Sequence, residues 1–253
     1  MISKGTVILL DKPAGLTSGQ AVRKLSQSFG LKAGHTGTLD GFATGLLVVC
    51  LGEARKAIPA FVGLPKTYTG TICLHGKAEK KDISRVFKKF TGKITQIPPR
   101  KSAVVRKPRK RVVYSFKPKK VKDRAVEFEV KCEAGVYIRK LAHDAGEALG
   151  CGAHLGELRR TSVGGLSVNQ ASKITDPKTH PLEKILDEIG LPKVKVKTSS
   201  VKGIRNGAPV KPRDILSKGK LKPGDLVGIF SGNKIIAVGI SQKDKIKTDR
   251  VFR

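Results

Sequence analysis

The chain has 253 residues, of which 51 are Lys or Arg and 20 are Asp or Glu, so its formal net charge is +31. Such an excess of one sign repels itself in a compact protein unless a polyanion compensates, so nucleic acid is the expected partner. The sequence has neither an apolar run of membrane-spanning length nor a basic amphipathic helix with a strong apolar face, which argues against a membrane.

The first fifty residues predict two buried strands with a helix between them. Residues 6–10 and 46–51 are continuous apolar runs of strand length. Between them, Thr17 and Gln20 have the spacing of a capping box, apolar residues follow at helical intervals, and Gly30 ends the pattern.

A glycine-rich loop, residues 34–45, follows this helix. It holds Asp40, the single acidic residue between Asp11 and Glu53. On the loop alone, the simplest interpretation of Asp40 is a turn residue. A lone carboxylate in so basic a chain is also a candidate nucleophile, because positive charge draws an anionic substrate toward it.

The middle of the chain predicts strands, a short helix and a basic stretch. Residues 67–75 alternate as a strand does, and residues 83–90 have helical spacing. A basic stretch between residues 100 and 122 contains Pro108 and Pro118, which indicate loops or edge strands. Because apolar residues interleave with its charges, we expect strands whose exposed face follows a phosphate backbone, although a solvated charged face would look similar. The candidate RNA-binding residues of this stretch are Arg106, Lys107, Arg109 and Lys110.

Residues 126–132 predict a half-buried strand and residues 138–149 a helix that ends at Gly150. Arg139 falls in the first turn of this helix, where the helix dipole disfavours a cation. We therefore expect Arg139 to have an anionic partner, either RNA or a carboxylate from elsewhere in the fold.

The residue pattern of the chain changes near Gly190. Short strands punctuated by Gly and Pro follow, and residues 226–230 and 235–240 are the clearest, joined as a hairpin through residues 231–233. This pattern predicts a first domain over residues 1–190 and a small β-barrel over residues 191–253.

Several segments resemble the TruB-type pseudouridine synthases in their order and spacing: residues 10–18, 34–40, 66–68 and 135–141. A narrower resemblance, to the archaeal dyskerin-like catalytic subunit of box H/ACA ribonucleoproteins, is carried by residues 98–104, 132–135 and 147–161. The tail resembles a PUA domain through residues 201–210 and 223–229. The resemblance implies an α+β fold, with a mixed, largely antiparallel sheet and flanking helices followed by a PUA-like barrel.

The resemblance also implies roles for individual residues. Asp40 corresponds to the nucleophile, and Arg139 to the arginine that keeps this carboxylate charged and oriented. Tyr68 corresponds to a tyrosine that packs on the flipped base and is a candidate to take the C5 proton, and His35 to a residue that fills the space the nucleotide leaves. Further candidate substrate-binding residues are Lys12, Thr38 and Ile138.

Taken singly, these residues have simpler interpretations. Tyr68 is an ordinary strand aromatic by its pattern, Arg139 a surface residue or phosphate contact, and Lys12 a residue that shapes a turn under the loop. One departure from the family pattern is Gly41, which stands where a proline usually follows the aspartate. A glycine leaves the unfolded loop more freedom than a proline does.

The cysteines and histidines indicate neither a metal site nor a disulfide framework. The cysteines form no C-x-x-C pair and are expected to be reduced thiols of a cytoplasmic protein: Cys50, Cys73, Cys132 and Cys151. The five histidines are too dispersed to suggest ligation. The family's reaction needs no metal or cofactor, so none is expected.

Two function classes remain open. The first is an RNA pseudouridine synthase acting on rRNA or tRNA. It would work as a monomer within an assembly of H/ACA guide RNA and three small partner proteins, or alone on the T-arm uridine of tRNA. The second is a non-catalytic RNA-binding or ribosome-associated protein on the same scaffold. The residues that favour the first class are Asp40, Tyr68 and Arg139.

Overall fold

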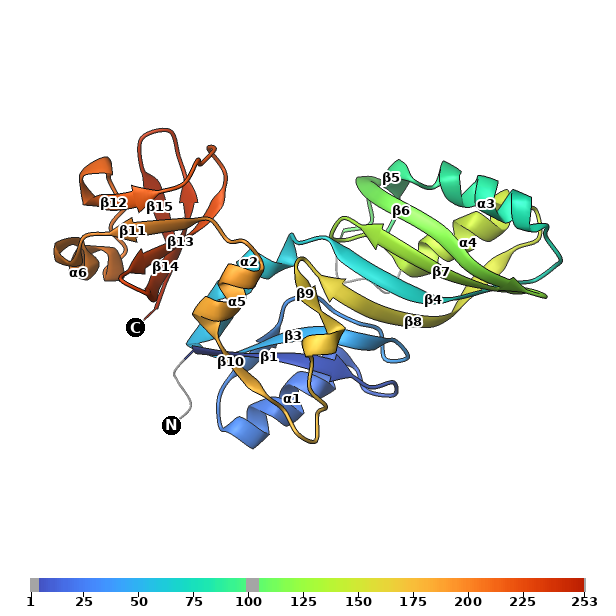
Figure 1. Cartoon of the computed structure of the whole chain (residues 1–253), viewed down its shortest axis with the longest axis horizontal. Coiled ribbons are helices and arrows are strands. Elements are labelled where there is room, and N and C mark those ends of the chain that lie inside the picture. Colours follow the sequence, from blue (N-terminus) through green and yellow to red (C-terminus); the bar gives the residue numbers. More distant parts are fainter. Residues whose placement is uncertain (1–4, 99–104, 253) are drawn as a thin grey trace.

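The computed structural model describes residues 5–98 and 105–252. Most of the segment 98–104, which contributed to the resemblance, lies outside these residues. The strands form a ten-stranded sheet, which ends at residue 181, and a five-stranded sheet, which begins at residue 193 (Figure 1).

The large sheet has the strand order β10-β1-β3-β8-β4-β7-β6-β5, with β2 paired to β3 and β9 to β8. Its strands are β1 (Gly5–Lys12), β2 (Ala33–His35), β3 (Thr44–Gly52), β4 (Lys66–Leu74), β5 (Gly92–Gln96), β6 (Arg109–Lys122), β7 (Ala125–Cys132), β8 (Ala153–Val163), β9 (Leu166–Ser167) and β10 (Thr179–Pro181). Among the described strand pairs of this large sheet, only β3–β8 is parallel. The predicted mixed, largely antiparallel sheet is therefore confirmed.

The β3–β8 pairing, which joins the two halves of the large sheet, is very short. Thr44 pairs with Arg159 and Gly45 with Arg160. A Cβ added to Gly45 would lie 2.3 Å from the carbonyl oxygen of Arg160, and its φ is +100°. Because only glycine permits this approach, Gly45 lets the residues after the Asp40 loop pass directly beside β8.

Helices α1 (Ser18–Phe29), α3 (Lys80–Lys89) and α4 (Ile138–Ala148) flank the sheet where the sequence predicts helices. Two further helices, α2 (Ile58–Val62) and α5 (Leu182–Glu188), were not predicted. The capping box of Thr17 and Gln20 and the left-handed Gly30 bound α1, as the sequence predicts. Helices α3 and α4 lie side by side over one face of the β4–β8 half (Figure 1), where Phe87 stacks on Phe116. No helix in the described part of the chain is long and apolar enough to cross a membrane.

Strand β6 is longer and more regular than the basic sequence suggests. It begins at Arg109 and includes Pro118. Strand β5, which the sequence analysis did not predict, pairs with β6 only as far as Val113. Around Pro118, β7 is the one strand of the described residues that pairs with β6, so the missing N–H of Pro118 removes no bond to β5.

The second sheet has the order β12-β11-β13-β14-β15. It comprises β11 (Lys193–Val196), β12 (Ile215–Lys218), β13 (Leu226–Ser231), β14 (Lys234–Ser241) and β15 (Ile246–Val251), and α6 (Val201–Arg205) follows β11. The predicted hairpin is present, with Gly232 at φ 59°. Within the described residues β12 and β15 do not pair, so the closed barrel expected from the sequence is not confirmed.

The two sheets share one hydrophobic cluster. Phe230 and Val238 of the second sheet, with Phe252 directly after β15, pack with Val7 and Leu9 of β1 and with apolar residues of β3, α2 and α5. The second sheet is therefore anchored to the β1 half of the large sheet, as Figure 1 shows, and not to the half that carries α3 and α4.

Candidate active site

A cleft of about 700 Å³ lies where the two halves of the large sheet meet. Its walls come from the Asp40 loop, the start of β4, the start of β6 and the turn that leads into α4. The lining residues are Thr36, Gly37, Thr38, Leu39, Asp40, Val62, Gly63, Lys66, Tyr68, Arg111, Ala134, Gly135, Val136, Tyr137, Ile138, Arg139, Leu158 and Arg160. The three residues on which the sequence-based hypothesis rests, Asp40, Tyr68 and Arg139, thus come together in one cavity.

Asp40 and Arg139 form a two-pronged ion pair across the cleft. Arg139 Nε lies 3.1 Å from Asp40 Oδ2, and Arg139 Nη2 donates to Asp40 Oδ1 over 3.2 Å. The side chain of Asp40 is 38% exposed and that of Arg139 is 53% exposed, so the pair remains accessible from solvent. Of the two partners expected for Arg139, the structure provides the carboxylate, and the paired geometry fixes the plane of that carboxylate.

Lys12 holds the Asp40 loop from beneath. Its side chain is fully buried, and its ammonium donates to the carbonyl oxygens of Pro13 at 2.8 Å, Leu16 at 2.6 Å and Gly41 at 3.4 Å. Burial lowers the pKa of Lys12, and the charge on Arg160 adds to this effect. Lys12 was a candidate substrate-binding residue, but its donors point to backbone carbonyls, which matches the alternative that it shapes the turn.

Ser18 fixes the loop one residue before Asp40. Its hydroxyl donates to the carbonyl of Leu39 at 2.9 Å and accepts from the N–H of Leu39 at 2.8 Å. The N–H of Gly15 donates to the carbonyl of Gly41 at 2.9 Å. Hydrogen bonds on both sides of Asp40 therefore restrain the loop, although Gly41 stands where the family usually has a proline.

Arg160 supports the same loop from β8, and the sequence analysis did not assign it a role. It is only 2% exposed, and its Nε donates to the carbonyl of Leu46 at 2.7 Å and its Nη2 to that of Gly37 at 2.9 Å. Both acceptors are more than a hundred positions away in the chain. Because this contact is non-local, no local pattern in the sequence could have predicted it.

Tyr68 lies directly opposite Arg160 in the β4–β8 register. Burial raises the pKa of Tyr68, and the nearby guanidinium of Arg160 offsets part of this effect. The hydroxyl is therefore a protonated phenol at neutral pH, which can donate a hydrogen bond and present a ring face to a base.

Lys66 stands two residues before Tyr68 in the same wall. Burial, with a contribution from Arg160, lowers the pKa of Lys66 to about 8. Its ammonium donates to the carbonyls of Val62 and Leu64, at 2.7 Å each. Lys66 thus ties the end of α2 to the strand that carries Tyr68.

Among the described residues, no three His, Cys, Asp or Glu side chains are grouped so that they could hold a metal ion.

Comparison with known proteins places the chain in a family. The model of the TruB family pseudouridylate synthase N-terminal domain matches residues 23–138, and that of the tRNA pseudouridylate synthase B C-terminal domain matches residues 139–192. The "probable tRNA pseudouridine synthase B" of Methanopyrus kandleri is 39% identical over 98% of this chain and 80% of its own length. The protein of the same name from Nanoarchaeum equitans is 38% identical over 95% of this chain and 74% of its own length. The chain belongs to the TruB family of pseudouridine synthases.

Solved structures give the same result for this TruB-family chain. The chain superposes with a TM-score of 0.87 on a Cbf5–Nop10–Gar1 complex, at 35% identity over 98% of this chain and 84% of the other. It superposes with a TM-score of 0.86 on an H/ACA ribonucleoprotein bound to a substrate RNA containing 2′-deoxyuridine, at 33% identity over 98% and 85%. The enzyme is therefore a pseudouridine synthase, an RNA uridine isomerase, with the fold of Cbf5.

The remaining candidate residues of this TruB-family enzyme differ in where they lie. Thr38 and Ile138 line the cleft. His35 does not line it, and its ring Nδ1 is buried with no hydrogen-bond partner among the described residues. Burial, assisted by the charge of Arg160, lowers the pKa of His35, so its imidazole is neutral at pH 7.

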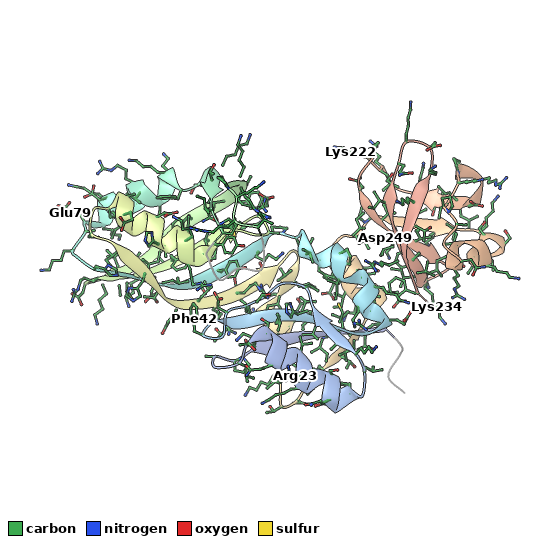
Figure 2. All side chains as sticks on the ribbon, turned by 180° about the vertical axis from the view of Figure 1, so that it is seen from behind. Arg23, Phe42, Glu79, Lys222, Lys234 and Asp249 are labelled. Atoms are coloured by element: carbon green, nitrogen blue, oxygen red, sulfur yellow. The ribbon has the colours of Figure 1, made fainter. Side chains whose placement is uncertain are left out.

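The basic candidates lie outside the cleft. Arg106, Lys107 and Lys110 are exposed, and the partly exposed Arg109 donates to the carbonyl of Val105 at 3.4 Å. Cationic side chains also project elsewhere in the molecule, for example Arg23, Lys222 and Lys234 (Figure 2), so charge alone does not single out this segment. The next residue, Arg111, belongs to the same basic stretch and does line the cleft, although the sequence analysis did not name it among the candidate RNA-binding residues.

Proposed function

We propose that this enzyme converts uridine to pseudouridine in RNA with Asp40 as the nucleophile, Arg139 as the residue that orients it and Tyr68 as the residue that packs on the flipped base. The observation that carries the proposal is the Asp40–Arg139 pair, which presents a fixed and accessible carboxylate inside a cleft of about 700 Å³. That volume suits a nucleoside whose base has left the RNA stack.

The reaction is an isomerisation. The bond between N1 of uracil and C1′ of the ribose breaks, the base rotates, and a bond forms between C5 and C1′. The proton that C5 loses is balanced by the proton that N1 gains, so no oxidant, reductant or co-reactant is consumed. In this proposal Asp40 bonds transiently to the sugar or the base and is released unchanged.

Tyr68 acts in this proposal as a neutral phenol. Its raised pKa keeps it protonated in the resting enzyme, and a neutral phenol accepts a proton poorly, so a water molecule or the departing Asp40 carboxylate is a better acceptor for the C5 proton. The ring face and the hydroxyl donor of Tyr68 would instead hold the base while it rotates.

We further propose that the chain works in the cytoplasm as the catalytic subunit of a guide-RNA assembly. The TM-scores of 0.87 and 0.86 against Cbf5 complexes over nearly the whole chain support this, as does the net charge of +31. Residues 1–190 would form the catalytic domain, and residues 191–253 a PUA-like RNA-binding domain built on the second sheet. The names of the archaeal relatives favour tRNA as a second substrate, and we propose that its T-arm uridine is modified without a guide.

The substitution Asp40→Asn tests the catalytic assignment. We expect it to lower pseudouridine formation by about 10³-fold or more and to leave RNA affinity nearly unchanged, because the amide keeps the shape of the carboxylate but not its nucleophilicity. Asp176→Asn, at an exposed position, is the control and should retain full activity. Undiminished product from Asp40→Asn would instead favour a role for another group. No product from the unaltered chain, even with guide RNA and partner proteins, would favour the non-catalytic RNA-binding class.

Reconstitution separates the two modes of action. Pseudouridine is mapped in tRNA and rRNA after incubation with the chain alone and with the chain plus an H/ACA guide RNA and the small partner proteins. Product at guide-specified positions only in the complete mixture supports guide dependence. Full activity on bare tRNA, unaffected by the guide, contradicts it.

A further inference from the structure

Arg111 lies in the cleft at the start of β6, immediately after the exposed basic segment, residues 105–110. Four cationic side chains line the cleft together with the single carboxylate of Asp40. Lys66 and Arg160 are bound to backbone carbonyls, and Arg139 is bound to Asp40. Arg111 is the cleft cation whose hydrogen-bonding capacity is used least.

The guanidinium of Arg111 keeps donors that the described residues do not satisfy. Its Nη1 donates to the carbonyl of Lys110 at 3.1 Å, and its Nε is buried without a hydrogen-bond partner among these residues. The carboxylate of Glu133 is 4.0 Å from Nη1, too far for a hydrogen bond, and accepts the N–H of Val112 instead. A buried donor without a partner calls for an explanation, and a ligand that arrives later is one.

Gly135 leaves room for this guanidinium. Its φ is +84°, and a Cβ added there would lie 3.0 Å from Arg111 Nε and 3.3 Å from Nη2. The turn that contains Gly135 is itself fixed, because Gln96 exchanges hydrogen bonds with the backbone N–H and carbonyl of Tyr137, at 3.0 and 3.2 Å. Arg111 thus packs against the same rigid turn that delivers Arg139 to Asp40.

We propose that Arg111 binds a backbone phosphate of the RNA next to the target nucleotide and so fixes the strand while the base enters the cleft. The inference rests on the proposed function and adds a substrate-binding residue to it. A guanidinium recognises a phosphate through paired, charge-assisted hydrogen bonds. Arg111 follows the exposed basic segment and lines the same cleft as the Asp40–Arg139 pair. An RNA strand that runs along the basic segment would therefore pass Arg111 next to the reacting nucleotide.

The test measures coupling between Arg111 and single phosphates. The probe is a T-arm stem–loop RNA in which a neutral methylphosphonate replaces one phosphate at a time around the target uridine. Affinity is measured for proteins that carry Asp40→Asn, so that bound RNA is not converted. With Arg111 present, neutralising one adjacent phosphate should weaken binding about tenfold. With Arg111→Gln, which should itself bind about tenfold more weakly, the same change should have no further effect.

Controls distinguish this coupling from a general loss of charge or of folding. Lys88→Gln removes an exposed charge from α3 and should show no coupling to any single phosphate. Arg111→Lys keeps the charge without the paired donors, so a weaker coupling at the same phosphate is expected if Arg111→Gln proves unstable. The proposal is overturned if neutralising each phosphate weakens RNA binding by the same factor in the protein with Arg111 and in the Arg111→Gln variant. Because these proteins carry Asp40→Asn, the result does not depend on turnover, and the product assay above decides the proposed function separately.

Discussion

The Asp40 loop and the basic segment, residues 105–110, are both expected to meet RNA, but the fold holds them in opposite ways. Ser18, Lys12 and Arg160 fix the backbone of the loop through buried hydrogen bonds on both sides of Asp40. The basic segment is mostly exposed. The carbonyl of Val105 accepts from Lys107 and Arg109 within the segment, and its last two residues, Arg109 and Lys110, pair with the edge strand β5. A nucleophile needs a fixed position, whereas charges that attract a flexible polyanion need only to be accessible.

A substitution in the Asp40–Arg139 pair is the strongest test of whether the nucleophile needs a fixed position. Arg139→Lys keeps the positive charge but removes the two-pronged contact with Asp40, so we expect kcat to fall about 10²-fold while RNA affinity changes by less than about twofold. Single-turnover kinetics and filter-binding measurements check the two quantities. Arg85→Lys, in the exposed pair with Asp82, is the matched control and should change neither. A full kcat for Arg139→Lys would mean that charge alone is sufficient and that the fixed geometry is dispensable.

Ser18→Ala tests whether the restraint on the loop matters for catalysis. It leaves the N–H and the carbonyl of Leu39 unpaired, so the free energy of unfolding should fall by about 1–3 kcal/mol and kcat by about tenfold. Thermal melts and turnover assays measure the two effects.

Ser26→Ala is the control for this change. It lies in the same helix and loses its hydrogen bond to the carbonyl of Leu31, away from the loop. It should lower stability while leaving kcat unchanged. If both variants lose stability and neither loses activity, the loop does not need its hydrogen bonds to position Asp40.

The sequence predicted the parts of this contrast that depend on local patterns. The capping box of α1, the helix that carries Arg139 and the alternating strand β7 all form where expected, because caps and periodicity act over a few residues. The family resemblance implied that Asp40, Tyr68 and Arg139 belong to one site, and in the structure all three line one cleft.

What the sequence did not predict depends on distant partners. Arg160 and Lys66 donate to backbone carbonyls. Every residue has a backbone carbonyl, so the residue types in the sequence do not indicate these contacts. Strand β5 is polar and short, and forms because β6 offers it an edge. The closed barrel was inferred from short strands and turns, which determine strand length but not whether the outer strands of a sheet meet.

The exposed basic segment should give the smallest effects, and they should appear in binding alone. Replacing Arg106, Lys107 or Lys110 by Gln should weaken RNA affinity by about twofold at moderate salt, because each charge is solvated and screened. If each contacts one phosphate, the slope of log affinity against log salt should become shallower by about 0.7 per residue removed, as counterion release from a single strand requires. The triple variant should therefore differ most from the unaltered chain at low salt and converge with it at high salt, with kcat unchanged. A loss of kcat, with the salt slope intact, would mean that the segment closes over the cleft and shares in positioning the nucleotide, which would remove the contrast with the Asp40 loop.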